Sequence, residues 1–216
     1  MSLAQTLAIW AVPVLLGITV HEVAHGWVAY RFGDSTAAEA GRLTLNPLPH
    51  VDWLGTLVLP LAMVASLGVA MGWAKPVPVD ASRLRRPRED MAWVAVAGPA
   101  SNALMLIAWA GIARLGLALD SEFGIILFAM GQAGIVINSV LMLLNLLPIP
   151  PLDGSVVLAR WLPPELGRKW LEFGRYGLIL VLALFLVGSL YGFIGKPLIA
   201  FIGAAHQFFG LPWMGS

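Results

Sequence analysis

Long uncharged apolar runs separated by short polar linkers dominate the chain from its first residues. Runs of about 20 apolar residues are long enough to cross the hydrocarbon core of a bilayer as helices. They cover the following ranges: Leu3–Tyr30, Trp53–Ala74, Met91–Ala113, Phe123–Leu147, Leu178–Ile194 and the shorter Pro197–Leu211. The pattern therefore predicts an all-α polytopic membrane protein, a bundle of about five to six transmembrane segments.

Two linkers contain residues that interrupt helices. In GRLTLNPLPH (41–50), Leu43–Leu45 favour a short strand and Asn46-Pro47 favour a turn. KPVPV (75–79) is expected to be extended, because each proline disfavours helix at the residue before it. Short extended or re-entrant elements are predicted near residues 43–50 and 74–80.

Composition agrees with a membrane class. The charged fraction is 12%, against about 25% in soluble domains, and mean hydropathy is +0.83. The absence of cysteine excludes disulfides and leaves His, Asp, Glu or water as ligands for a zinc ion. No basic cluster alternates with aromatics in a way that would indicate nucleic acid as a partner. One domain, residues 1–216, is expected, with a catalytic core at about 3–160 and C-terminal helices at about 161–216.

The distribution of basic residues predicts the orientation. The loops at 75–90 and 160–175 are the basic ones and are expected to face the cytoplasm. The apolar stretch 51–73 then has cytoplasmic loops at both of its ends, so it is expected to re-enter and turn near Pro60 rather than to span. The alternative is that one of the loops departs from the charge rule. The first apolar run lacks the features of a cleaved signal peptide and is expected to be retained.

The first apolar run contains His21-Glu-Val-Ala-His25, directly behind the uncharged stretch Leu3–Val20. Two histidines four residues apart lie on one face of a helix, so both rings can reach a single metal ion. Glu22 lies about 100° round the helix, where a carboxylate can take a proton from a metal-bound water. Because ionisable groups inside an apolar span are costly, the cluster indicates a functional site, a zinc hydrolase within the membrane.

A third protein ligand is expected, with the fourth position left open for water. Asp153 is the best candidate, in NLLPIPPLDG (145–154), where prolines end a helix and Gly154 permits a tight turn. Irregular backbone at membrane depth is tolerated only inside protein or beside a wet cavity, as a membrane hydrolase requires. The alternative is that Pro-Leu-Asp-Gly forms an ordinary turn after a helix.

HEVAH together with Asn145, Pro148 and Asp153-Gly154 resembles the site-2 protease family of intramembrane zinc metalloproteases. The pieces GRLTLNP, AKPVPV and GPASN, at 41–47, 74–79 and 98–102, resemble a compact bacterial branch of that family. The family often carries a PDZ or CBS domain, and neither is recognised in this chain. The resemblance implies an integral multi-pass protein of a bacterial inner membrane, with the lipid bilayer around it.

The resemblance also implies roles for particular residues. His21, His25 and Asp153 would hold one Zn²⁺ per chain, and Glu22 would be the general base. Asn102 and Asn145 match family asparagines that face the catalytic cavity. Either could donate a hydrogen bond to the oxyanion or to the substrate backbone.

The implied activity is hydrolysis of peptide bonds in or near transmembrane segments of membrane proteins, such as membrane-tethered regulators (regulated intramembrane proteolysis). Glu22 would activate a zinc-bound water that attacks the scissile carbonyl. The alternatives are a metal-binding membrane transporter and a catalytically silent membrane chaperone. Glu22 separates the first alternative from a protease, because metal transit needs no carboxylate beside the ligands.

Four further features of the sequence carry expectations of their own. KPVPV could bind an unwound substrate by strand addition or be a plain linker. Asn138 is expected to join helices by hydrogen bonds rather than to take part in chemistry. His50 and His206 are expected to be solvated, and the arginines at 83–88 to contact lipid head groups.

Overall fold

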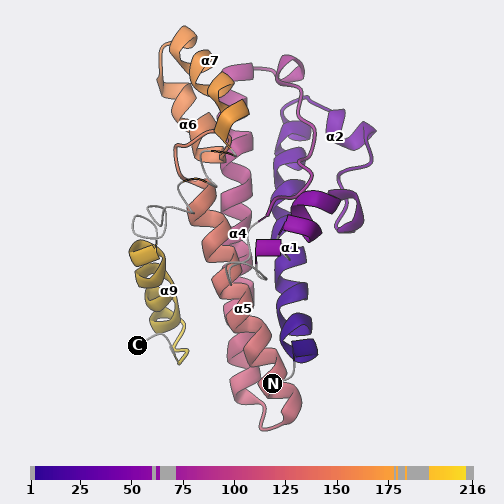
Figure 1. The fold of residues 1–216 in the computed structure, drawn as a ribbon, viewed down its shortest axis with the longest axis vertical. Coiled ribbons are helices and arrows are strands. Elements are labelled where there is room, and N and C mark those ends of the chain that lie inside the picture. The colour runs from indigo at the N-terminus through magenta and orange to yellow at the C-terminus, as the bar shows by residue number, and fades with distance from the viewer. Residues whose placement is uncertain are drawn as a thin grey trace.

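Three long helices standing side by side form the body of the molecule (Figure 1). The computed structural model describes residues 3–59, 62–63, 72–177, 179, 183 and 195–212. The long helices are α1 (Leu3–Arg31), α4 (Pro87–Ala118) and α5 (Glu122–Asn145). The shorter elements are α2 (Thr36–Glu39), η1 (Leu48–His50), η2 (Trp53–Val58), η3 (Ala81–Arg83), α6 (Asp153–Trp161), α7 (Pro164–Glu172), η4 (Phe173–Tyr176) and α9 (Lys196–Phe208).

Among the described residues, three helices are long and apolar enough to cross a membrane: Gln5–Arg31, Pro87–Ala118 and Glu122–Asn145. This confirms the prediction of an all-α polytopic membrane protein. The predicted span Leu178–Ile194 lies almost wholly outside the described residues, so the count of five to six segments stays a prediction. The last predicted segment is the helix α9, whose 13 residues extend about 20 Å, less than the hydrocarbon core of about 30 Å.

Small residues allow the long helices to approach closely. A Cβ added at Gly131 would lie 2.6 Å from Ala113, and one at Gly134 would lie 2.1 Å from the ring of Trp109. Without a hydrophobic driving force between helices in lipid, such close backbone contact is a main source of association. Close packing along their length therefore holds α4 and α5 together. Trp109 and Ala113 of α4 belong to a buried apolar cluster to which α9 adds Ile202.

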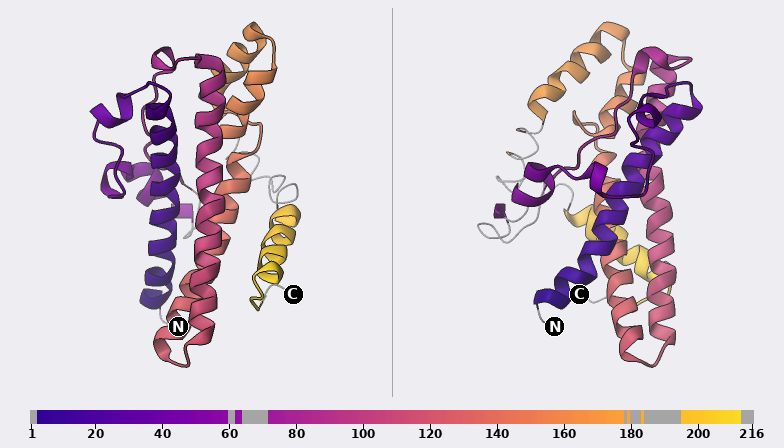
Figure 2. Two further views of the ribbon diagram at one scale, coloured as in Figure 1. Left: turned by 180° about the vertical axis from the view of Figure 1, so that it is seen from behind. Right: turned by 90° about the vertical axis from the view of Figure 1, so that its right-hand side faces the viewer.

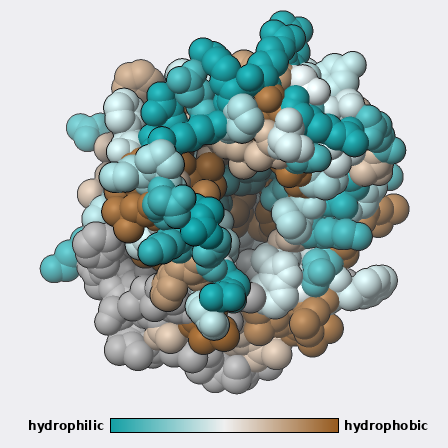
Figure 3. Space-filling model, turned by 90° about the horizontal axis from the view of Figure 1, so that it is seen from above, coloured by the Kyte–Doolittle hydropathy of each residue, from teal (hydrophilic) through white to brown (hydrophobic). Residues whose placement is uncertain are grey.

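The connection between α1 and α4 leaves and returns at the same end of the bundle. The backbone N–H of Arg85 donates to the carbonyl of Phe32 over 3.1 Å. Figures 1 and 2 show this connection beside α1, on the opposite side of the bundle from α9. Figure 3 shows the end of the molecule to which the connection returns, where hydrophilic residues gather around a hollow.

The two ends of the apolar stretch 51–73 meet. The N–H of Trp73 donates to the carbonyl of Gly55 over 3.1 Å, and the Thr56 hydroxyl donates to the carbonyl of Trp73 over 3.0 Å. A single crossing would separate these residues by the thickness of the membrane, so the contacts favour the predicted re-entrant path. The turn expected near Pro60 lies outside the described residues.

The short strand predicted at Leu43–Leu45 is wrong. Residues 43–47 are irregular, with bends at 44, 45 and 47 that lead into η1, and the extended residues 72–80 belong to no β-ladder of the described chain. The backbone N–H of Asn46 donates to Thr44 Oγ1, and the N–H of Leu48 donates to Asn46 Oδ1. These side-chain acceptors compete with strand pairing, which is why the Leu-Thr-Leu sequence did not produce a strand.

His50 and His206, predicted to be solvated, are buried, with 2% and 0% of their surfaces exposed. His206 joins α9 to α5 through a contact between its Nε2 and Gln132 Oε1. His50 lies in η1, within the connection between α1 and α4, and its carbonyl accepts the N–H of Lys75 over 2.9 Å. Both predictions failed because each histidine lies in a segment that packs against distant parts of the chain.

Candidate metal centre

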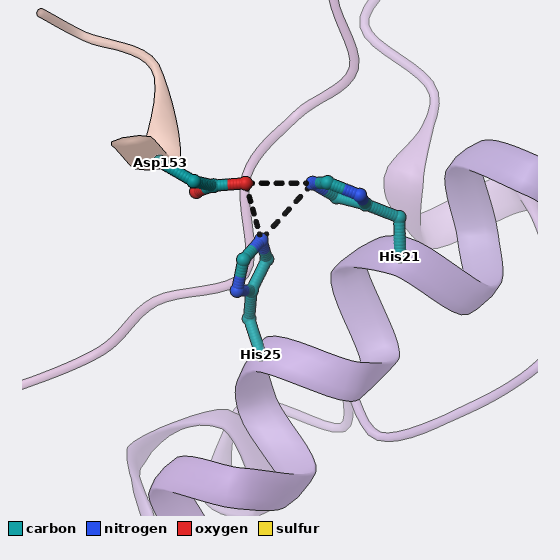
Figure 4. A group of neighbouring side chains, drawn as sticks. All are labelled: His21, His25 and Asp153. Carbon is teal, nitrogen blue, oxygen red and sulfur yellow. Dashed lines mark hydrogen bonds and ion pairs between the residues drawn. The ribbon is translucent and has the colours of Figure 1, made fainter. Parts of the chain in front are cut away.

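His21, His25 and Asp153 converge on one point between α1 and the start of α6 (Figure 4). Asp153 Oδ2 lies 3.3 Å from His21 Nε2 and 3.4 Å from His25 Nε2, and the two Nε2 atoms lie 3.0 Å apart. The spacing of four within α1 places both rings on one face, as predicted. Asp153 lies far from the two histidines in the sequence, and the packing of α6 on α4 brings it to them.

The partners of the two rings determine which nitrogens face the centre. His25 Nδ1 donates to the carbonyl of Val94 over 2.6 Å, and His21 Nδ1 donates to Asn102 Oδ1 over 2.7 Å. The orientation of the Asn102 amide follows from its Nδ2, which donates to the carbonyl of Gly17 and to Asn138 Oδ1. With both Nδ1 atoms protonated, both Nε2 atoms present lone pairs to each other and to a carboxylate.

Three electron-rich atoms at this separation could hold a metal ion between them, and their chemistry suits zinc. Zinc–nitrogen and zinc–oxygen distances of about 2.0–2.1 Å in a tetrahedron correspond to ligand–ligand edges of about 3.3–3.4 Å. Asp153 Oδ2 is buried and makes no hydrogen bond to the described residues, as a coordinating oxygen would. Two histidines and one carboxylate leave the fourth position open, the arrangement of a catalytic rather than a structural zinc site.

Close packing at Gly154 positions Asp153. Asp153 is the first residue of α6, and a Cβ at Gly154 would lie 2.2 Å from the carbonyl oxygen of Leu146 at the end of α5. No other side chain fits here without moving the backbone of either helix. Gly154 was expected to permit a tight turn, but its role is this close approach between helices.

One face of α4 supports the two histidines. Val94, Gly98 and Asn102 are spaced four apart, and α4 runs antiparallel to α1, so that they meet His25 and His21 in reverse order (Figure 1). A Cβ at Gly98 would lie 2.4 Å from His25 Nε2 and 2.5 Å from His21 Cε1. The helix α4 continues through Gly98, and the missing side chain of this glycine leaves room for the two rings.

We expect Gly98→Ala to lower zinc affinity by at least about tenfold, because the added methyl displaces both rings from their Nδ1 partners. Alanine is otherwise favoured over glycine in a helix by up to about 1 kcal/mol, so the helix itself should not weaken. Gly111→Ala in the same helix is the matched control, since a Cβ there meets nothing within 4 Å. Competition with a chromophoric chelator measures the affinities, and equal values for the two variants would contradict this role of Gly98.

The two asparagines predicted at the cavity lie in different surroundings. Asn102 is fully buried behind His21, and both N–H bonds of its amide are used, on Gly17 and Asn138. Asn138 joins α5 to α4 through this bond, which confirms its predicted structural role. Asn145 is half-buried at the end of α5, where its Nδ2 donates to the carbonyl of Leu141 over 2.9 Å.

Glu22 contacts the extended residues 72–80 from the half-buried side of α1. The backbone N–H of Val77 donates to Glu22 Oε2 over 2.8 Å. Sequence reasoning did not predict that Val77 would bind Glu22. The one available signal was the Pro-Val-Pro pattern, which leaves a single N–H donor in three residues.

The fold and this site together define a polytopic membrane protein in which a His-His-Asp group that could hold a metal lies beside the glutamate of an HExxH helix. The chain is 38% identical over 180 residues to "putative zinc metalloprotease YwhC" of Bacillus subtilis, covering 81% of this chain and 78% of that one. It is 32% identical over 201 residues to "putative zinc metalloprotease Rip2" of Mycobacterium tuberculosis, covering 91% and 71% of the two chains. No family model and no solved structure matches the chain. The chain belongs to the site-2 protease family.

Proposed function

We propose that the protein is an intramembrane zinc metalloprotease that hydrolyses peptide bonds in or near transmembrane segments of other membrane proteins. One observation carries the proposal: the ligand atoms of His21, His25 and Asp153 meet next to Glu22. The two histidines and Glu22 lie in α1, a helix that is able to span a membrane. His21 and His25 lie about 15 and 9 Å along α1 from its end at Arg31. Peptide bonds at that depth are within the reach of the site.

The chain's own residues can perform the proton transfers of hydrolysis. A zinc ion held by His21, His25 and Asp153 would polarise a water molecule and lower its pKa toward neutrality. Glu22 accepts the proton of the attacking water and passes it to the leaving amine. Asn102 acts on His21, since its N–H donors are already used inside the protein, and it holds the ring that binds the metal.

Asn145 is the asparagine that we propose for substrate contact. It is half-buried at the end of α5, eight residues before Asp153, and among the described residues its Nδ2 donates only to the carbonyl of Leu141 in its own helix. Turning the side chain away from Leu141 costs one local hydrogen bond and frees two N–H donors. Those donors could hold the substrate backbone or the oxyanion.

We further propose that the substrate is a membrane-tethered protein such as a regulator, cut within the inner membrane of a bacterium. A substrate helix must unwind before attack, because its peptide bonds are covered by their own hydrogen bonds. The basic loops at 75–90 and 160–175 would face the cytoplasm, where acidic lipids favour them. The hydrophilic, hollowed end of the molecule supports that orientation (Figure 3).

The test is cleavage of a single-span protein by the full chain in lipid vesicles, with the zinc content measured in parallel. We expect about one zinc per chain and cleavage that stops on chelation and returns with added zinc. Cleavage that persists in chelator, in protein shown to be free of metal, would contradict the proposal. A soluble peptide of the same sequence, offered without membranes, reports whether the activity depends on a membrane substrate.

A further inference from the structure

We propose that Arg42 is a positioning residue that aligns the Glu22 carboxylate through the segment Lys75–Val79; the proposal rests on the proposed proteolytic function. Arg42 lies in GRLTLNP, outside the metal centre, and is 8% exposed. Its Nη2 donates to the carbonyl of Lys75 over 2.8 Å and to that of Pro76 over 3.3 Å. The next backbone N–H along the chain is the one that binds Glu22.

The proline pattern makes this contact specific. Pro76 and Pro78 have no N–H, so Val77 supplies the single donor of the three residues, and this donor is spent on Glu22 Oε2. Proline also limits the backbone on either side to extended conformations. A shift of the segment by one residue would therefore present Glu22 with no donor at all.

The segment is held at both ends. At one end the N–H of Lys75 donates to the carbonyl of His50, beside the Arg42 contacts. At the other end the N–H of Asp80 donates to Asp34 Oδ2 over 2.7 Å, and Asp34 is fully buried just beyond α1. Burial raises the pKa of Asp34, but the hydrogen bonds from Thr36 and Asp80 outweigh burial and hold this pKa below its ordinary value. The Asp34 carboxylate therefore stays ionised.

Packing brings the segment close to the turn of α1 that carries the motif. A Cβ at Gly26 would lie 2.8 Å from Val77 Cγ1, so the glycine after His25 lets Val77 sit against the helix. Glu22 has three rotatable side-chain bonds, and one fixed oxygen leaves the other oriented for proton transfer. No hydrogen bond to Oε1 is formed by the described residues. Arg42 thus acts on Glu22 through Val77 without touching reacting atoms.

This contact also bears on the strand-addition hypothesis for KPVPV. The N–H groups of Lys75 and Val77 are both used inside the protein. An unwound substrate that pairs here would find carbonyl acceptors rather than these donors. Strand addition through the Val77 N–H would release Glu22, so the two roles exclude each other at that atom.

The test compares Arg42→Gln and Arg42→Lys in vesicles, with Arg168→Gln as the control. Arg168 is an exposed arginine on α7 that pairs with Glu165 and Glu172, far along the chain from the site. We expect Arg42→Gln to lower kcat at least tenfold with KM and zinc content unchanged, and Arg42→Lys to recover part of the loss. In a zinc-loaded sample without substrate, the backbone N–H of Val77 should exchange with solvent at least tenfold faster in Arg42→Gln. A peptide fragment covering 76–78 reports this amide alone, because both flanking residues are prolines.

Val77→Pro removes the donor directly and keeps the proposal testable if Arg42→Gln does not fold. Its control is Val79→Pro, since the N–H of Val79 makes no hydrogen bond with the described residues and position 79 lies in the same extended segment. We expect at least a tenfold fall in kcat for Val77→Pro and less than a twofold change for Val79→Pro. Unchanged exchange at Val77 in Arg42→Gln, unchanged kcat in Val77→Pro, or a rise in kcat in either would overturn the proposal. The exchange result does not depend on activity, so it stands or falls separately from the proteolytic function.

Discussion

Glu22→Gln is expected to lower the cleavage rate by about two to four orders of magnitude while leaving the bound zinc in place, the range that a general base contributes. The carboxylate is not among the three converging ligand atoms, so its loss should not open the metal centre. Glutamine keeps the size of the side chain and an oxygen that can accept the Val77 N–H. What it lacks is the ability to take a proton from water near neutral pH.

The measurement is kcat on a single-span substrate in vesicles, with zinc content determined on the same sample. Glu39→Gln is the matched control, because Glu39 is exposed on α2 and pairs with Arg83 at the surface. Cleavage by Glu22→Gln at a rate near that of the wild type would rule out Glu22 as the general base. Another group would then have to accept the proton of the attacking water.

Asp153→Ala is expected to weaken zinc binding by at least about 100-fold. Loss of a residue that only hydrogen-bonds to a metal ligand typically costs about 10–100-fold, and loss of a ligand itself should cost more. Removing the carboxylate leaves two neutral imidazoles and no negative charge to offset the cation. The folded bundle should survive, since Asp153 Oδ2 makes no hydrogen bond to the described chain and α6 is held by its own packing. Activity should fall together with metal occupancy and recover partly at high zinc concentration.

A competitive zinc titration against a chromophoric chelator measures this loss. Asp120→Ala is the control, because Asp120 is an exposed aspartate in the α4–α5 turn, at the opposite end of the bundle from α7 (Figure 1). If Asp153→Ala binds zinc as tightly as Asp120→Ala, the third ligand is another residue. Glu22 would be the first to consider, and its variant would then lose zinc as well.

The apolar runs and the HExxH spacing determined a large part of this protein by themselves. Hydropathy alone predicts α1, α4 and α5, because a bilayer leaves a helix as the only way for an isolated apolar segment to satisfy its backbone. The period of a helix places His21 and His25 on one face wherever α1 lies. Asp153 could be chosen as the third ligand because Pro148 and Gly154 mark the end of a span, where a side chain can project from irregular backbone.

The tertiary structure decided the rest, which depends on the register between segments far apart in the sequence. Hydropathy does not select the register of α1 against α4, and the observed register aligns Val94, Gly98 and Asn102 with the two histidines. The meeting of Gly55 with Trp73 and the burial of His50 likewise depend on long-range contacts, which composition does not encode. Local spacing thus determined which side chains could hold a metal. Helix packing decided which of their atoms face it and which backbone N–H holds the glutamate beside it.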